Sequence, residues 1–292
     1  MSDAVFHAAG DQLNEEALRD TIRHRVQAAG TSFYWGMRLL PRDRRNAMYA
    51  VYAFCREVDD IADGEKPVAE KLAALTAWRE EIDALYCGFP RHLVSRALLD
   101  PTRRYVLRRE DFLAVIAGME MDAAEDIRAP DLATLDLYCA RVASAVGHLS
   151  VHVFGDRSGA AHSVAESLGR ALQLTNILRD LDEDAARQRL YLPRELLERH
   201  GIRGSDPIAI LRHPALPAVC RDLAAVAEDH FRDASRAMAQ CSRRAMRPAA
   251  VMAATYRATL STLQQAEWRD PAARISLSKP LKLWLVLRHG LL

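Results

Sequence analysis

The stretch LGRALQLTNILRDLDED, residues 168–184, decides how the rest of the chain is interpreted. On a helical wheel of about 100° per residue, its polar residues fall on one narrow stripe, and apolar residues occupy much of the remaining circumference. The stripe consists of Gly169, Gln173, Asn176, Asp180 and Asp184. A surface helix shows the reverse, a broad polar face and an apolar stripe. The stretch therefore predicts a helix surrounded by protein, whose polar stripe faces a polar partner or a cavity.

A second acidic stretch, AMYAVYAFCREVDDIADGE at residues 47–65, repeats this pattern. Tyr52, Arg56, Asp59 and Asp63 follow one another at spacings of four, three and four residues. On a helix they share one face, at positions where core residues would be expected. The chain thus carries two pairs of aspartates, each with i, i+4 spacing on an otherwise apolar helix.

Burying four unpaired carboxylates would cost so much free energy that they would take up protons or bind cations instead. Mg²⁺ prefers oxygen ligands, keeps several waters and binds the phosphate oxygens of ligands. Two carboxylate pairs on facing helices therefore favour a cluster of magnesium ions. The alternative is that the aspartates form ion pairs with arginines, for which the candidates are Arg56, Arg179, Arg187 and Arg189.

A magnesium cluster suits a substrate with a diphosphate, because Mg²⁺ screens its charge and makes it a better leaving group. Arginines can bind its oxygens in a forked geometry. Loss of diphosphate from an allylic carbon leaves a carbocation, which aromatic faces can stabilise and a water-poor cavity can protect. The aromatic residues near the polar motifs, several of them expected to be ordinary core, are Tyr34, Trp35, Tyr49, Tyr52, Phe54 and Tyr138.

The fold class follows from composition and breakers. Strong helix formers dominate the 292 residues, apolar residues recur at spacings of three and four, and Gly- and Pro-containing stretches separate long segments. Pro41 suits the first turn of a helix that runs to about Asp63. We expect an all-α single domain over residues 1–292, with roughly eight to ten helices and a flexible start of about 15 residues.

Several classes of protein are excluded or disfavoured. The net charge of +1 gives no basic excess for nucleic acid. Five scattered cysteines indicate reduced thiols in a cytoplasmic protein, and the acidic first 20 residues lack the order of a secretory signal. No uncharged run approaches the roughly 20 residues of a membrane span. The segment KPLKLWLVLRHGLL, residues 279–292, favours a last core helix, with peripheral contact at the inner face of the cell membrane as the alternative.

The two acidic motifs resemble those of a known family. DDIAD at 59–63 and NILRDLDED at 176–184, followed by RLYLP at 189–193, are similar to the two DxxxD motifs of the squalene/phytoene synthase family. The resemblance extends from about Thr31 to Leu287. It includes TSFYWGMRLLP at 31–41, YAFCREVDD at 52–60, YCARVASAVG at 138–147 and LGRALQLTNILRD at 168–180. It implies an all-α isoprenoid synthase fold with a central cavity, and head-to-head joining of two C15 or C20 prenyl diphosphates.

The resemblance also implies roles for individual residues. Two or three Mg²⁺ ions, held with the diphosphates, would be bound by Asp59, Asp63, Asn176, Asp180 and Asp184. The catalytic residues would be Tyr52, Arg56, Asp59, Asp63, Tyr138, Asp180 and Asp184. The diphosphates would be contacted by Arg56, Arg179, Arg189 and Tyr191, and anchored further by Tyr256 and Lys279. The substrate region would be lined by Ser32, Phe33, Tyr52, Tyr138, Gln173 and Asn176.

Within the family, SFYWGMRLLP and YAFCREVDDIADGE are most similar to the bacterial members that make presqualene diphosphate in the hopanoid pathway. This resemblance implies that two farnesyl diphosphates condense through ionisation, attack by a double bond and proton loss that closes a cyclopropane. No GxGxxG follows a strand, so no nucleotide cofactor is expected for this first half-reaction. A pathway partner would take presqualene diphosphate onward.

Three alternatives stay open. A phytoene or dehydrosqualene synthase would use the same aspartates. A non-catalytic assembly factor on the same scaffold is a different class of protein, although such relatives tend to lose the aspartates. His148 and His152 could bind a metal at i, i+4 spacing, but no HExxH glutamate accompanies them, so packed or surface histidines are expected.

Overall fold

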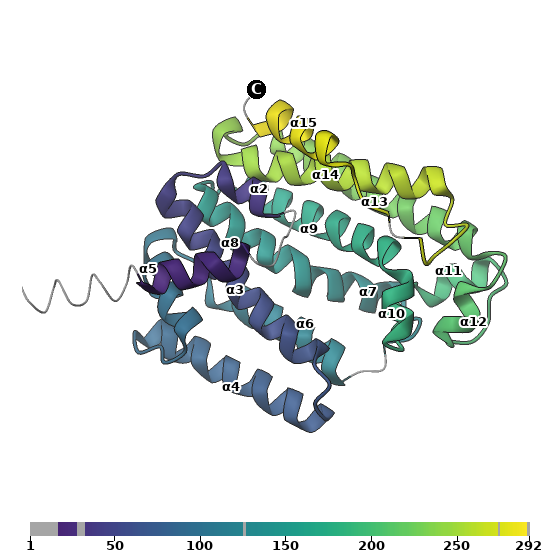
Figure 1. Cartoon of the computed structure of the whole chain (residues 1–292), viewed down its shortest axis with the longest axis horizontal. Coiled ribbons are helices and arrows are strands. Elements are labelled where there is room, and N and C mark those ends of the chain that lie inside the picture. The colour runs from purple at the N-terminus through teal and green to yellow at the C-terminus, as the bar shows by residue number, and fades with distance from the viewer. Residues whose placement is uncertain (1–16, 28–32, 125–126, 274, 291–292) are drawn as a thin grey trace, which may run out of the picture.

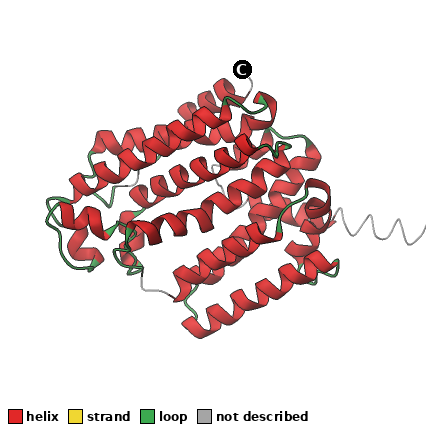
Figure 2. Ribbon diagram, turned by 180° about the vertical axis from the view of Figure 1, so that it is seen from behind, coloured by secondary structure: helices red, strands yellow, loops and turns green. Residues whose placement is uncertain are grey.

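The protein is helical throughout its described residues, which in this computed structural model are 17–27, 33–124, 127–273 and 275–290. Figure 2 shows helices joined by loops, without a strand in this part of the chain. The predicted all-α class is therefore confirmed. The expected flexible start, residues 1–15, lies outside the described residues.

Residues 17–27 are helical, and the elements that follow are α2 (Phe33–Arg38), α3 (Arg42–Asp63), α4 (Val68–Cys87), α5 (Leu93–Tyr105), α6 (Arg109–Ala124), α7 (Leu132–Cys139), the π-helix η1 (Ala140–Ser144), α8 (Ala145–Phe154), α9 (Gly159–Arg179), α10 (Leu181–Ala186), α11 (Arg194–Arg199), α12 (Pro207–Leu211), α13 (Leu216–Met238), α14 (Arg243–Ala266) and α15 (Lys279–Gly290). These described helices exceed the eight to ten expected, because α2, α10, α11 and α12 are only five or six residues long and because α7, η1 and α8 follow one another without a break. Such short helices give too few periodic residues to be recognised in sequence.

The first acidic motif ends the long helix α3, as predicted. Pro41 stands just before the first helical residue, where its fixed φ and missing N–H cost nothing. One face of α3 is apolar and packs on α4 and α6. There Phe54 meets Trp78 and Phe112 edge to face, with ring centroids 5.5 and 5.1 Å apart. Burying each such side chain contributes about 1.5–3 kcal/mol, which fixes α3 against its neighbours.

Helix α9 lies in the middle of the fold, as its narrow polar stripe predicts (Figure 1). It packs against α7, η1, α8, α13 and α14. Ser158 caps its N-terminus by accepting from the Ala161 N–H at 3.2 Å. Even its buried Thr175 is satisfied within the helix, because its hydroxyl donates to the Ala171 carbonyl at 2.7 Å. The helix that carries the second motif is thus enclosed by protein.

The π-helix η1 fits between α6 and α9 because two glycines let the backbones approach. A Cβ on Gly169 would lie 2.6 Å from the Ser144 Cα and N atoms. A Cβ on Gly118 would lie 2.5 Å from a Val142 side-chain carbon. A π-turn inside a run of α-helix often marks a functional site, because it shifts the side chains that follow. Here it begins at Ala140, two residues after Tyr138.

A short parallel bridge positions the segment that follows α10. The Leu190 N–H donates to the Ile127 carbonyl at 2.8 Å, and the Ala129 N–H donates to the Leu190 carbonyl at 2.9 Å. Gln188 adopts a left-handed φ of 60°, which turns the chain between Arg187 and Arg189. The bridge and the turn bring this segment to the end of α6.

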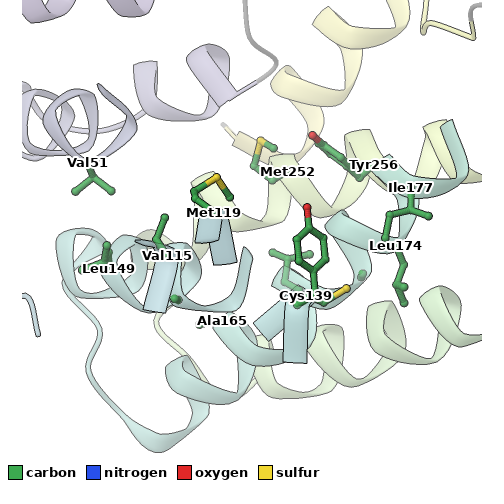
Figure 3. Close-up of a cluster of buried hydrophobic side chains, with 14 of the residues drawn as sticks. Val51, Val115, Met119, Cys139, Leu149, Ala165, Leu174, Ile177, Met252 and Tyr256 are labelled. Carbon is green, nitrogen blue, oxygen red and sulfur yellow. The ribbon is translucent and has the colours of Figure 1, made fainter. Parts of the chain in front are cut away.

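The core is one connected cluster of buried apolar side chains that extends from Ile22 to Trp268. Figure 3 shows one region of it, where Val115 and Met119 of α6 lie in the same cluster as Met252 and Tyr256 of α14. Helix α15 packs on α14 and α2 at the outer edge of the fold (Figure 1). Within the described residues, the helices fall short of the length and apolarity that crossing a membrane requires.

Candidate active site

The first acidic motif lies at the C-terminal end of α3, and its carboxylates are paired with arginines. Arg56 binds Asp59 at 3.0 Å and Asp60 at 2.5 Å, both from one turn earlier in the helix. Burial, followed by the charge of Asp63, raises the pKa of Asp59 to about 6. Asp59 therefore resists ionisation in spite of its arginine partner.

Asp63 is bound by two arginines from the segment that follows the second acidic motif. Arg187 and Arg189 both bind its carboxylate, the latter at 2.8 Å. Burial opposes ionisation of Asp63, but the hydrogen bonds from Arg189 and Arg187 outweigh it and lower the pKa. Because these arginines follow α10, they form a bridge between the two acidic motifs. We call this pair of residues the arginine bridge.

The second acidic motif does not lie on one continuous helix, which corrects the sequence-based expectation. Helix α9 ends at Arg179, and Asp180 adopts φ −104° and ψ 20° before α10 begins. Aspartate is a weak residue inside a helix, since its side chain competes for local hydrogen bonds. Two helix-like bonds survive the break, from the Asp180 N–H to the Asn176 carbonyl and from the Asp184 N–H to the Asp180 carbonyl, both at 2.9 Å. Asn176, Asp180 and Asp184 therefore still follow one another by one helical turn each, in spite of the break.

Asp180 and Asp184 differ in their partners. The Arg179 guanidinium grips Asp180 with two bonds of 2.7 and 2.6 Å. Burial alone would lower the pKa of Arg179, but the hydrogen bonds to Asp180 raise it. Among the described residues, Asp184 has no side-chain hydrogen bond or ion pair, and burial with the nearby Asp180 raises its pKa to about 7. Asp184 thus has the carboxylate most in need of a cation.

Asp122, near the end of α6, is a site residue that the sequence analysis missed. Its carboxylate accepts hydrogen bonds from the Tyr191 hydroxyl at 2.6 Å and the Tyr138 hydroxyl at 2.9 Å. The two rings stack with centroids 5.0 Å apart. Burial raises the pKa of Asp122, and the bonds from the two tyrosines oppose that rise. We call these three residues the Asp122 clamp.

The clamp lies between the two acidic motifs. The charge of Asp122 contributes to the raised pKa of both Asp59 and Asp184. A signal for it exists in the sequence, since Val115, Met119 and Asp122 are spaced by four and three on one helix face. The same argument that singled out Asp59 therefore applies to Asp122.

Five of the predicted site residues share one pocket of about 200 Å³. They are Tyr52, Arg56, Asp59, Tyr138 and Gln173. Its remaining walls are Cys55, Val115, Met119 and Val142, so apolar atoms of α3, α6 and η1 line it. The pocket joins the first motif to the polar stripe of α9.

The other predicted residues lie around this pocket or apart from it. Arg179 and Asp180 line a neighbouring hollow of about 270 Å³ beside residues 271–273. Tyr256 is buried, and its hydroxyl lies within hydrogen-bonding reach of the Arg179 and Asn176 side chains. Lys279 is exposed at the start of α15. Ser32 and the side chains of Phe33 and Trp35 lie outside the described part of the structure.

One buried polar atom at the site lacks a partner. The Asn176 side-chain nitrogen donates to Gln173 at 3.3 Å, but the Asn176 Oδ1 is buried without a hydrogen bond. Such orphaned atoms are uncommon and indicate a missing ligand, water or ion. Within the described residues, no three His, Cys, Asp or Glu side chains are grouped closely enough to hold a metal by themselves. Asp59, Asp63 and Asp180 form the ion pairs with arginines that the sequence offered as the alternative to a metal cluster, whereas Asp184 has no such pair in the described part of the chain.

The two histidines considered as a metal pair have protein partners. His148 binds Asp111 at 3.2 Å and Glu166 at 3.1 Å. His152 is buried, and its Nδ1 lies 2.9 Å from the Val106 carbonyl. The interpretation of packed histidines is therefore favoured.

Comparisons with known proteins identify relatives of this arrangement. A family model described as squalene/phytoene synthase matches residues 26–280. A protein of Sinorhizobium fredii named presqualene diphosphate synthase is 48% identical over 269 residues, covering 92% of this chain and 96% of that protein. One of the same name from Zymomonas mobilis is 50% identical over 262 residues, 89% of each chain. A solved dehydrosqualene synthase in complex with a ligand superposes with a TM-score of 0.82 at 26% identity, covering 94% of this chain and 96% of that one.

Proposed function

This chain belongs to the squalene/phytoene synthase family, and from that premise we propose that it joins two farnesyl diphosphates head to head into presqualene diphosphate. It is a prenyltransferase of the squalene type. The high identity to proteins named presqualene diphosphate synthase supports the finer assignment of product. The observation that carries the proposal is the pair of acidic motifs on α3 and α9–α10, which the arginine bridge connects through its two ion pairs with Asp63.

The residues of the site fit magnesium with a diphosphate. The ions would be held by Asp59, Asp63, Asn176, Asp180 and Asp184. Two features support this: the raised pKa values of Asp59 and Asp184, and the unpartnered Asn176 Oδ1. Mg²⁺ needs few protein ligands because phosphate oxygens and waters complete its shell. Bound Mg²⁺ would make diphosphate a better leaving group.

The arginines of the site would bind the diphosphates. Arg56, Arg179 and Arg189 each hold an aspartate of a motif in the structure. A guanidinium binds phosphate and carboxylate oxygens with the same forked geometry, so each can exchange one anion for the other. Tyr191, fixed by Asp122, adds a hydroxyl beside Arg189.

The pocket beside Asp59 suits the reactive carbon. Ionisation of one farnesyl diphosphate gives an allylic cation at C1 and free diphosphate. Tyr52 and Tyr138 border this pocket, and aromatic faces stabilise cations. Val115, Met119 and Val142 exclude water, which would quench the cation. The C2–C3 double bond of the second substrate forms a bond to C1, and loss of one proton closes the cyclopropane. The products are presqualene diphosphate, diphosphate and a proton.

The product keeps one diphosphate on a long apolar chain, so a second protein must consume it if the pathway continues to a hydrocarbon. We propose that this chain supplies such a partner in hopanoid formation. The first half-reaction leaves no oxidised or reduced carbon that would call for a nucleotide cofactor.

Product analysis tests the proposal. Purified protein is incubated with Mg²⁺ and either farnesyl or geranylgeranyl diphosphate, with and without NADPH, and the products are identified by mass spectrometry. We expect presqualene diphosphate from farnesyl diphosphate, with and without NADPH. Squalene with NADPH, or dehydrosqualene without it, would assign a different final product, and phytoene from geranylgeranyl diphosphate would assign a different substrate. A folded protein that releases no diphosphate would instead favour the non-catalytic assembly factor.

A further inference from the structure

Positive charge is concentrated in the last part of the chain. Residues 241–292 contain nine Arg and Lys side chains and two acidic ones, a net charge of +7, whereas the whole chain has +1. Helices α14 and α15 contain no Asp or Glu. Both helices lie along one edge of the molecule (Figure 1), so this edge carries a net positive charge, whereas residues 1–240 carry a net charge of −6. Such asymmetry indicates a negatively charged partner.

Helix α15 presents large apolar side chains to solvent on this basic side. Leu281, Leu283, Trp284 and Leu287 are 37, 55, 49 and 47% exposed. Leu285 and Gly290, on the opposite face, are buried where α15 packs on α14 and α2. The sequence analysis favoured a last core helix, and that interpretation holds for one face only. A helix with large apolar side chains on its exposed face as well as on its packed face needs a second apolar environment.

Arginines border the apolar face. The guanidinium of Arg288 lies over the Trp284 ring, 5.0 Å from its centroid. A groove of about 1190 Å³ between α13, α14 and α15 is lined by Arg244, Arg247 and Arg288, among others. Arg244 and Arg247 also line the adjoining hollow that contains Arg44. Arg244 and Arg247 are exposed, and neither forms an ion pair with another described residue. Their charges are therefore available to a partner.

We propose that the outer face of α15 and the arginines of the α14 groove form a binding surface for an anionic phospholipid bilayer. Leucines and a tryptophan enter the interfacial region of a bilayer, and arginines bind lipid phosphates with several hydrogen bonds each. A second copy of the chain is a weaker candidate, because a symmetric dimer through this surface would bring two net positive faces together. We call this region the α15 surface. Only the biological role of this surface rests on the proposed function: it would place the enzyme at the membrane, where apolar substrates and products accumulate.

Vesicle sedimentation of the full chain tests the α15 surface. The vesicles are phosphatidylcholine alone or phosphatidylcholine with phosphatidylglycerol. The apolar variant combines Leu283→Ser, Trp284→Ser and Leu287→Ser, and the basic variant combines Arg244→Gln and Arg247→Gln. The matched control is Phe89→Ser, which removes an apolar side chain that is 79% exposed between α4 and α5.

We expect the native chain to sediment with the anionic vesicles and to dissociate as salt is raised. The apolar variant should bind at least about tenfold more weakly, and the basic variant should lose its preference for anionic vesicles. The control should bind as the native chain does. Equal binding by the apolar variant and the native chain, or no binding to any vesicle, would overturn the proposal. A smaller sedimentation coefficient of the lipid-free apolar variant would assign the surface to a second copy instead.

Activity separates this proposal from the proposed function. All of these variants should turn over farnesyl diphosphate dispersed in detergent at the native rate, because none of the changed residues lies at the acidic motifs. A native chain that binds anionic vesicles but releases no diphosphate would contradict the enzymatic function and leave the α15 surface standing. Full activity in detergent without vesicle binding would support the enzymatic function and contradict the α15 surface.

Discussion

Asp122 joins two tyrosine hydroxyls between the acidic motifs, and it shows what a sequence pattern can and cannot find. The paired spacing of Asp59 with Asp63 attracted attention, whereas a single carboxylate on α6 did not. The hydroxyl partners, Tyr138 and Tyr191, are far from Asp122 in the chain, so only the fold brings them together. The arginine pairs of the aspartates could be anticipated as candidates, but which arginine binds which aspartate depends on side-chain directions.

Removing the Asp122 carboxylate should loosen both tyrosines. Asp122→Ala should lower kcat at least about tenfold, since two buried hydroxyls lose their acceptor and their rings lose a fixed orientation. Asp122→Asn keeps one acceptor and should lose less. Steady-state kinetics of both variants provides the measurement, with circular dichroism to check folding. Native rates in both variants would remove Asp122 from the site's function.

Neutralising the motif aspartates should affect activity and stability differently. Asp59→Asn and Asp180→Asn should each lower activity at least about 100-fold, because stabilisation of charge in the transition state is lost. In metal-free buffer, Asp59→Asn should leave the melting temperature unchanged or higher, since a carboxylate that resists ionisation disappears. Asp180→Asn should lower it, because the partly buried Arg179 loses one of its two bonds and the negative charge that balances it. Normal turnover by both variants would disprove the metal assignment.

The pH dependence of stability follows from the two raised carboxyl pKa values. The ordinary aspartate pKa is 3.8, and burial raises that of Asp59 to about 6 and that of Asp184 to about 7. The folded state therefore keeps protons that the unfolded chain has lost, so these groups lose stabilisation as pH rises from about 4 to about 7.

The test compares the native chain with an Asp59→Asn, Asp184→Asn double variant in metal-free urea unfolding. The variant should gain stability relative to the native chain as pH rises through this range. A constant difference across the range would mean that neither carboxylate has a raised pKa.

Helices α9 and η1 show how much of the structure the spacing of apolar residues can predict. The stripe on α9 predicted its enclosure, because the position of apolar residues around a helix depends only on its own sequence. The break at Asp180 and the π-turn after Cys139 could not be predicted, since both arise from contacts with other elements. Gly169 was placed on the polar stripe, but its role is to admit the backbone of η1.

A methyl group at Gly169 should therefore be costly. Gly169→Ala places a Cβ 2.6 Å from the Ser144 backbone, and neither backbone can yield without moving a helix. We expect a loss of about 1–3 kcal/mol in the free energy of unfolding. Gly159→Ala in the first turn of the same helix is the control, because its Cβ would meet nothing within 4 Å. It should be neutral or stabilising by up to about 1 kcal/mol in the same urea titration.

The general form of the protein was predictable, because an all-α class needs only composition, periodicity and breakers. The basic segment 241–292 can be counted in the sequence, but its position along one edge of the molecule depends on the fold. The exposure of α15 could not be read from its residues either, because KPLKLWLVLRHG is equally suited to a core and to a surface that contacts lipid.

Ligands of the native state should stabilise the protein as a unit. Mg²⁺ together with inorganic diphosphate should raise the melting temperature more than Mg²⁺ alone, because the diphosphate supplies both oxygen ligands for the ion and acceptors for the arginines. Differential scanning fluorimetry measures this, with Asp184→Asn as the comparison variant, in which the shift should shrink. An equal shift in that variant would place the ions elsewhere.

The arginine bridge gives the site counter-ions of its own. Arg189 is largely buried, and both Arg187 and Arg189 already neutralise a carboxylate. An incoming diphosphate then displaces the Asp63 carboxylate from these guanidinium groups, and the arginines need not lose a full hydration shell when it binds. Substrate capture at this site is consequently an ion-exchange process, and its affinity should vary less with ionic strength than that of a cleft lined by unpaired arginines.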